Sequence, residues 1–117
     1  MITVAETKAF QRKIEDLLSD QEKEDLIYYL SEHPNSGALM RGTGGIRKLR
    51  WAQSGRGKSG GIPVIYYFHS ESMPLYLLAA FGKNEKANLS EQERNILAKA
   101  VKELVEIWRQ RNGKGIL

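Results

Sequence analysis

The stretch Arg41–Gly61 reads RGTGGIRKLRWAQSGRGKSGG, and the rest of the chain is organised around it. It holds seven of the chain's eleven glycines and six basic residues, with no acidic residue to neutralise them. The basic residues are Arg41, Arg47, Lys48, Arg50, Arg56 and Lys58. Uncompensated positive charge on a glycine-rich segment is typical of a surface that binds a phosphate backbone. Composition alone leaves a second interpretation open, a solvated hairpin with a flexible basic loop.

The segment RKLRW at Arg47–Trp51 has enough β-compatible character to form a strand. Successive side chains of a strand point to opposite faces of its sheet. Lys48 and Arg50 therefore share one face, and Leu49 and Trp51 share the other. We predict that one face of this strand is buried and that the other presents two cations.

The totals restrict the class of protein. A length of 117 residues indicates a single domain, residues 1–117, large enough for a hydrophobic core. The absence of cysteine excludes a disulfide framework and a thiolate metal site. The N-terminus lacks a signal-peptide pattern, and no apolar run approaches the roughly 18 residues that span a bilayer. We expect a soluble cytoplasmic protein without a membrane partner.

The net charge of +4 is unevenly distributed. Residues 1–40 carry four basic and eight acidic side chains (net −4), residues 41–86 carry eight and two (net +6), and residues 87–117 carry six and four (net +2). The basic excess lies in the middle of the chain, which favours a polyanionic partner there.

The apolar patterns predict an α+β fold in the order β-α-α-β-β-β-α, with a small antiparallel-dominated sheet, two N-terminal helices and one C-terminal helix. The first helix follows Thr7 and has one apolar stripe, Phe10, Ile14, Leu17 and Leu18. Capping-box patterns at Ser19–Glu22 and Ser90–Glu93 begin the other two helices. The expected strands are residues 1–6, 47–51, 62–68 and 75–81, and residues 112–117 are expected as a flexible tail.

Several familiar motifs fail on context. Gly55–Gly60 matches G-x-G-x-x-G, but a strand follows it where a dinucleotide site needs a helix. A P-loop ending at Gly57-Lys58-Ser59 would need glycine at position 52, which is Ala52. The two histidines, His33 and His69, belong to a helix stop and a turn, so a catalytic pair or a zinc site is not favoured, and we expect no metal and no cofactor.

The basic residues are left as the main candidates for a site. Lys48 and Arg50 on one strand, Arg56 and Lys58 in the next loop, and Lys83 and Lys86 after the last strand can converge, because neighbouring strands bring their ends together. Tyr66 and Tyr67 alternate across a strand, so one is a core residue and the other a candidate for stacking on a base. We select Tyr66, with Arg41, Arg47, Arg56 and Lys58, as the RNA-binding set.

Four segments of the sequence, taken in order, resemble the RelE/HigB superfamily of toxins from bacterial toxin–antitoxin pairs, and the HigB-type branch most closely. The segments are GTGGIRKLRW, GRGKSGG, VIYYF and FGKNEK. The resemblance covers about residues 3–108. It implies a sheet flanked by helices that enters the ribosomal A site and cleaves mRNA there, with a cognate antitoxin as its inhibitor. DNA is implied only indirectly, through the antitoxin. A DNA-binding regulator is disfavoured because no helix is basic along one face.

The resemblance also implies a metal-free mechanism, in which an RNA 2′-OH attacks the adjacent phosphate while basic side chains move protons and neutralise charge. By motif match, Lys48 is the candidate base or charge stabiliser and Arg50 the phosphate clamp. Lys83 and Lys86 are expected to grip phosphate or to assist the leaving group.

Two positions depart from the pattern of the superfamily. Many relatives carry an arginine at the start of the third strand, where this chain has Pro63. Some also use an aromatic residue near the C-terminal helix, and in this chain no Tyr or His follows Tyr76 to fill that place. Either Arg56 or Lys58 substitutes for the missing charge, or activity is weakened or lost. The alternative function is therefore a catalytically inactive protein of the same fold that binds RNA, the ribosome or an antitoxin.

Overall fold

The computed structural model describes residues 1–52, 61–82, 85 and 89–116, with residues 112–116 as backbone only. Within these residues the centre is a five-stranded sheet in the order β1-β5-β4-β3-β2. The strands are β1 Val4–Glu6, β2 Ala38–Leu39, β3 Ile46–Trp51, β4 Ile62–Tyr67 and β5 Leu75–Ala80. Neighbouring strands pair antiparallel except β1 and β5, which run parallel. The predicted α+β class and antiparallel-dominated sheet are confirmed.

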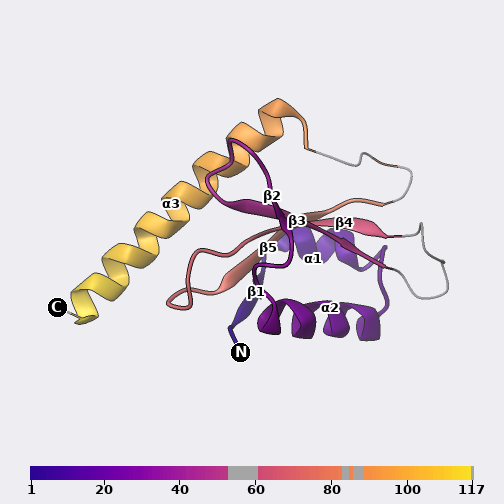
Figure 1. Cartoon of the computed structure of the whole chain (residues 1–117), viewed down its shortest axis with the longest axis horizontal. Helices are drawn as coiled ribbons and strands as arrows, with labels where there is room; N and C mark the ends of the chain where they lie inside the picture. The colour runs from indigo at the N-terminus through magenta and orange to yellow at the C-terminus, as the bar shows by residue number, and fades with distance from the viewer. Residues whose placement is uncertain (53–60, 83–84, 86–88, 117) are drawn as a thin grey trace.

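Three helices accompany the sheet in the described part of the chain, α1 Lys8–Ile14, α2 Asp20–Glu32 and α3 Glu91–Ile116. Helices α1 and α2 lie on one face of the sheet and α3 crosses the other, as Figure 1 shows. We call these faces the helix-pair face and the α3 face. In β3 and β4 the helix-pair face carries Arg47, Leu49, Trp51, Val64 and Tyr66, and the α3 face carries Ile46, Lys48, Arg50, Pro63, Ile65 and Tyr67.

Strand β1 begins three residues later than predicted, and β3, β4 and β5 each differ from the prediction by one residue at one end. Three further differences concern β2, α1 and α3. The structure adds β2, whose two residues pair with Arg47 and Lys48 and are too few to give a periodic sequence pattern. Helix α1 ends at Ile14, so Leu17 and Leu18 of the predicted stripe follow the helix, although Leu18 is still buried. Helix α3 continues to Ile116, so the backbone of residues 112–116 is helical, and the flexibility of that segment stays a prediction.

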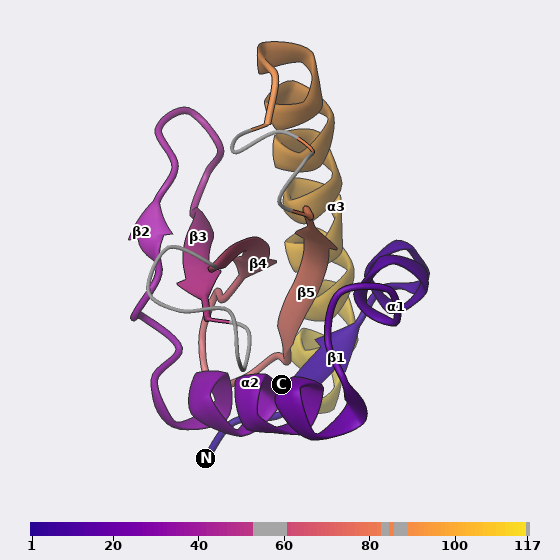
Figure 2. The same ribbon diagram turned by 90° about the vertical axis from the view of Figure 1, so that its right-hand side faces the viewer.

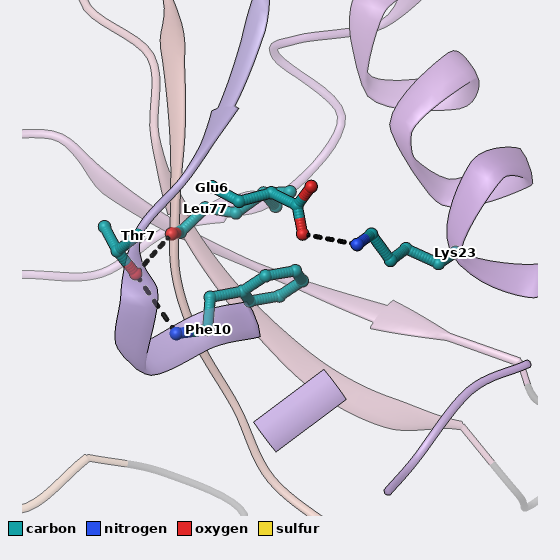
Figure 3. Close-up of polar contacts among 5 residues, drawn as sticks. All are labelled: Glu6, Thr7, Phe10, Lys23 and Leu77. Atoms are coloured by element: carbon teal, nitrogen blue, oxygen red, sulfur yellow. Dashed lines mark hydrogen bonds and ion pairs between the residues drawn. The ribbon is translucent and has the colours of Figure 1, made fainter. Parts of the chain in front are cut away.

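The beginning of α1 is tied to the sheet by Thr7, as Figure 3 shows. The Thr7 hydroxyl accepts a hydrogen bond from the Phe10 N–H (3.2 Å) and donates to the Leu77 carbonyl (2.9 Å). One side chain therefore caps the helix and attaches it to β5. Glu6 of β1 pairs with Lys23 of α2 (2.8 Å), which joins the second helix to the sheet edge (Figure 3).

The core on the helix-pair face is the more deeply buried of the two. Both N-terminal helices contribute side chains with no exposed surface, such as Phe10 of α1 and Leu30 of α2. The predicted capping box of α2 is present, with the Glu22 N–H bonded to Ser19 Oγ (3.1 Å) and the Ser19 N–H to Glu22 Oε1 (2.8 Å). The buried cluster is Phe10, Ile14, Leu18, Leu26, Leu30, Ile62, Val64, Tyr66, Leu75, Leu77 and Ala80.

The α3 face has its own core under α3. A register shift between β4 and β5 pairs Ile65 with Ala79 and Tyr66 with Leu77, so Leu78 is an extra residue in β5. Leu78 and Ala79 consequently both belong to the cluster under α3, which explains why this strand reads as a continuous apolar run. Near its C-terminal end α3 is fixed by Trp108, whose Nε1–H donates to Tyr76 Oη (3.0 Å).

Candidate nucleic-acid interface

The two cations of β3 lie where the sequence places them. β3 alternates, with Leu49 and Trp51 packed against the helix-pair core and Lys48 and Arg50 on the α3 face. Lys48 is half-buried and Arg50 is exposed. The predicted alternation is therefore found, but the two faces of β3 do not differ sharply in burial, because Leu49 and Trp51 are only half-buried, as Lys48 is.

The neighbours of these cations on the sheet are apolar. Antiparallel pairing sets Lys48 opposite Ile65 and Arg50 opposite Pro63. On the next strand Ile65 pairs with Ala79, and the Phe81 N–H donates to the Pro63 carbonyl (3.2 Å). The described part of β4 and β5 thus adds no charge beside Lys48 and Arg50, and Pro63 lies at the position facing Arg50.

The other predicted basic residues, Arg56, Lys58, Lys83 and Lys86, lie outside the described residues. The chain positions that flank them are described. Trp51 at the end of β3 pairs with Ile62 at the start of β4, and the Phe81 N–H bonds to Pro63, so Ala52, Gly61 and Gly82 belong to the same end of the sheet. This is also the end at which Arg50 lies. That all six cations form one site stays a prediction.

Glu85 is a residue that the sequence patterns did not single out. Its Oε1 accepts a hydrogen bond from the Gly82 N–H (2.7 Å) and pairs with Lys13 Nζ of α1 (2.5 Å). The Glu85 N–H in turn donates to the Gly82 carbonyl (3.1 Å). This contact attaches the segment that follows β5 to helix α1. No pattern signals it, because its two ends lie in unrelated parts of the sequence.

Arg41 belongs to a tight turn between β2 and β3. Thr43 is buried, its hydroxyl donates to the Met40 carbonyl (2.6 Å), and it accepts the Ile46 N–H (3.0 Å). Gly42, Gly44 and Gly45 have positive φ (76°, 76° and 117°), a conformation that explains the glycines of the GTGG word. The turn rises on the side of the sheet that α3 occupies, as Figure 2 shows.

Arg47 lies apart from Lys48 and Arg50. Its position in β3 puts it on the helix-pair face, and its Nη1 donates to the carbonyls of Asn35 (3.1 Å) and Gly37 (2.7 Å). The structure therefore does not bring Arg47 together with the two cations on the α3 face. Its guanidinium holds the turn after α2.

Tyr66 is the clearest correction to the predicted RNA-binding set. It has no exposed surface, so it offers no face on which a base could stack. Its hydroxyl accepts the Gly37 N–H (2.8 Å) and donates to the Pro34 carbonyl (2.8 Å). A Cβ on residue 37 would lie 2.8 Å from Tyr66 Cε1, so this close approach requires glycine. Burial raises the pKa of Tyr66, although the Gly37 N–H and the charge of Arg47 act in the opposite direction.

Tyr67 does not replace Tyr66 as a stacking residue. It points to the α3 face, as the alternation predicts, but only 5% of it is exposed. Its hydroxyl lies 3.3 Å from Nδ1 of His69, and burial raises its pKa. The sequence distinguishes the two faces of β4 and does not reveal that both are covered.

One comparison with known proteins bears on this fold. A family model described as the RelE toxin of the RelE / RelB toxin-antitoxin system matches residues 2–112, nearly the whole chain. The chain belongs to the RelE toxin family. RelE toxins act in toxin–antitoxin systems and are generally ribosome-dependent mRNA endoribonucleases with an antitoxin partner. The three helices and the five-stranded mixed sheet agree with the resemblance found in the sequence.

Two further features of this RelE-family chain concern membrane-spanning helices and metal-ligand groups. Among the residues that the structure describes, no helix combines the length and the apolar character needed to cross a bilayer. In the same residues, no three side chains of His, Cys, Asp or Glu gather as metal ligands.

Proposed function

We propose that this chain is a ribosome-dependent endoribonuclease that cleaves mRNA in the ribosomal A site and thereby inhibits translation. The observation that carries the proposal is the pair of cations, Lys48 and Arg50, on the α3 face of β3 in a RelE-family fold. Arg50 is exposed at the end of the sheet from which both glycine-flanked basic segments leave. The positive charge of this face attracts a polyanion such as RNA more strongly than a neutral substrate.

The proposed reaction is an internal transfer at phosphorus and needs no metal or cofactor. A base removes the proton of the 2′-OH, the resulting oxygen forms a bond to the adjacent phosphorus, and the bond to the 5′-oxygen breaks. The departing oxygen takes up a proton, which leaves a 2′,3′-cyclic phosphate and a 5′-OH. Lys48 is the base or a stabiliser of the charge on the phosphoryl oxygens, and Arg50 clamps the phosphate through its guanidinium fork.

The other cations complete the proposal. Lys83 and Lys86 grip phosphate or assist the leaving group, and Arg41, Arg56 and Lys58 bind the RNA backbone. We propose that the chain belongs to the HigB-type branch, on the resemblance carried by the four segments GTGGIRKLRW, GRGKSGG, VIYYF and FGKNEK. Its partners are then the ribosome with its mRNA and a cognate antitoxin. The chain contacts DNA only indirectly, through the antitoxin. It acts in the cytoplasm.

The test is primer extension on an mRNA in a reconstituted translation reaction, with new 5′ ends mapped against the reading frame. We expect cuts that follow the frame and disappear when ribosomes are omitted. Lys48→Ala should lower the rate of cutting by about 100-fold or more, the usual loss for a group that moves a proton in the transition state. Lys99→Ala is the matched control, because Lys99 is exposed on α3. Equal cutting of free RNA, or full activity of Lys48→Ala, would contradict the proposal.

A second function is favoured by one observation, the position of Pro63. This buried proline pairs with Arg50 across β3 and β4. The resemblance to the superfamily implies an arginine at this position, aimed at the scissile phosphate. The second proposal is a protein of the same fold that binds RNA or the ribosome without cutting. It predicts salt-sensitive RNA binding and no new 5′ ends. Cutting by Pro63→Arg in an otherwise inactive chain would support it, and frame-linked cutting by the natural chain would contradict it.

A further inference from the structure

A hollow of about 420 Å³ lies between the β2–β3 turn and the first turns of α3. Its two positively charged walls are Arg41 from the turn and Arg94 from the helix. Leu89, which forms part of its lining, also belongs to the core under α3, so the hollow opens on the α3 face. The lining is Arg41, Gly42, Leu89, Glu91, Arg94 and Asn95.

Local hydrogen bonds fix both arginines at their backbones. The Thr43 hydroxyl and the bond from the Met40 N–H to the Ile46 carbonyl (2.8 Å) hold the turn that carries Arg41. The capping box of α3, in which the Ser90 N–H donates to Glu93 Oε1 (2.8 Å), holds the first turn of the helix. The Arg94 N–H donates to the Ser90 carbonyl (2.9 Å). Local hydrogen bonds thus hold the backbone on both sides of the hollow, and the Glu93 N–H is bonded to Ser90 Oγ (3.1 Å).

The charge in the hollow lacks a protein partner. Within residues 1–52, 61–82, 85 and 89–111, neither Arg41 nor Arg94 forms an ion pair, and Nε of Arg94 is buried without a hydrogen-bond acceptor. A buried donor without an acceptor lowers stability, which makes the Arg94 guanidinium a candidate to bind an anion. Glu91 is the acidic residue in the lining, and two guanidinium groups outweigh it.

We propose that this hollow is a second phosphate site, in which the guanidinium groups of Arg41 and Arg94 bind one phosphodiester of an RNA strand. The inference rests on the proposed function, because it extends the basic face of β3 along the same side of the sheet. Guanidinium groups match the oxygens of a phosphate in pairs, which is why arginine is favoured over lysine at such sites. A strand that passes Lys48 and Arg50 on the α3 face then has a further anchor beside α3. The site positions RNA and takes no part in the bond rearrangement.

The test is the affinity of the full chain for a short single-stranded RNA, measured over a series of salt concentrations. Arg41→Gln and Arg94→Gln should each weaken binding and should each reduce the slope of log K against log salt by about 1. Because both arginines hold the same phosphate, the double variant should lose less than the sum of the two single losses. Arg94→Lys keeps the charge and the half-buried stem, so it should fold as the natural chain and bind with an intermediate affinity.

Two further variants make the assignment specific. Glu91→Gln should strengthen RNA binding, because it removes the opposing charge from the lining, an effect that a structural role of the hollow does not predict. Lys99→Gln removes an exposed cation of α3 outside the lining and should leave the affinity unchanged. An unchanged salt slope in both arginine variants, or an equal loss in Lys99→Gln, overturns the proposal. Weakened binding of polyglutamate with unchanged RNA binding also overturns it, because the hollow then binds an acidic protein segment.

The outcome is separable from that of the proposed function. In the cleavage reaction the arginine variants should need more ribosomes for half-maximal rate but should keep the maximal rate, whereas Lys48→Ala should lower the maximal rate. If Lys48→Ala abolishes cutting and the arginine variants behave as the natural chain, the proposal of a second phosphate site is contradicted and the proposal of endoribonuclease activity is supported. If the natural chain does not cut and the arginine variants still show a reduced slope of log K against log salt, the proposal of endoribonuclease activity is contradicted and the proposal of the phosphate site is supported.

Discussion

The two faces of the sheet are built differently. On the helix-pair face, α1 and α2 together span few turns and yet bury Phe10, Ile14, Leu26 and Leu30 completely. On the α3 face a single long helix of 26 residues covers part of the sheet, and Val101 is its one buried side chain among residues 91–111. The remaining apolar residues of its inner stripe, such as Leu97 and Leu104, are half-buried. The difference teaches that the most deeply buried core lies on the side of the sheet opposite to the proposed RNA-binding cations.

The distribution of charge follows the same division. Arg47, whose side chain lies on the helix-pair face, uses its guanidinium to bind protein carbonyls. Arg50, three residues further along β3, is exposed on the α3 face and has no bonded protein acceptor within the described residues. A closely packed face satisfies its polar groups internally. The more loosely covered face leaves the Arg50 side chain exposed.

The strongest test of this comparison is a matched pair of core truncations. Leu30→Ala on the helix-pair face should lower the free energy of unfolding by about 2–5 kcal/mol, because Leu30 is fully buried and a cavity remains. Leu104→Ala on the α3 face removes the same atoms from a half-buried position and should cost roughly half as much. Urea denaturation of both variants provides the measurement. Equal losses would show that the two faces contribute equally to stability.

Tyr66→Phe and Tyr67→Phe compare the faces at the level of a single hydroxyl. Tyr66→Phe leaves the Gly37 N–H and the Pro34 carbonyl without their partner inside the core and should cost about 1–3 kcal/mol. Tyr67→Phe loses one longer contact to the exposed His69 and should cost less. A larger loss in Tyr67→Phe would reverse the comparison. The fold of each variant is checked by circular dichroism before the denaturation curves are compared.

The same two hydroxyls predict a pH dependence. Burial raises the pKa of Tyr66 and of Tyr67, so above the ordinary value of about 10 the unfolded chain releases protons that the folded chain retains. Stability from this source is complete below about pH 10 and is lost as the pH rises toward the folded pKa. The decline in unfolding free energy above pH 10 should therefore be shallower in Tyr66→Phe than in the natural chain. An identical decline in both proteins would contradict the assignment.

Much of the fold is predictable because its signals are local. The local signals are the capping boxes at Ser19 and Ser90, the alternation in RKLRW and the helix stop at His33. Each acts within a few residues and is found where the pattern puts it. β2 is not predicted, because two residues are too few to show the alternation of apolar side chains that is typical of a strand. The end of α1 at Ile14 is not predicted either, because the apolar stripe continues past the helix. That Lys48 and Arg50 share one face of the sheet follows from alternation alone.

The candidate site is less predictable, because burial and partners are properties of the tertiary fold. Alternation separates Tyr66 from Tyr67, but only the packing of α2 and α3 shows that both rings are covered. The neighbours of Arg94 and Arg41 likewise come from segments far apart in the sequence. For the same reason no pattern reveals the contact between Lys13 and Glu85.

That contact offers the smallest and most selective test, because it links α1, which covers the helix-pair face, to the chain leaving β5 at the basic end of the sheet. Both side chains are substantially exposed (38% and 41%), so Lys13→Ala should cost less than about 1 kcal/mol of unfolding free energy and still less at high salt. Glu85→Ala should cost more than Lys13→Ala at every salt concentration, because it also removes the acceptor of the Gly82 N–H. The exchanged pair Lys13→Glu with Glu85→Lys restores the opposite charges but not that acceptor, so it should recover only the salt-dependent part of the loss. Full recovery would mean that the Gly82 bond contributes nothing, and the attachment of this segment to α1 would then be purely electrostatic.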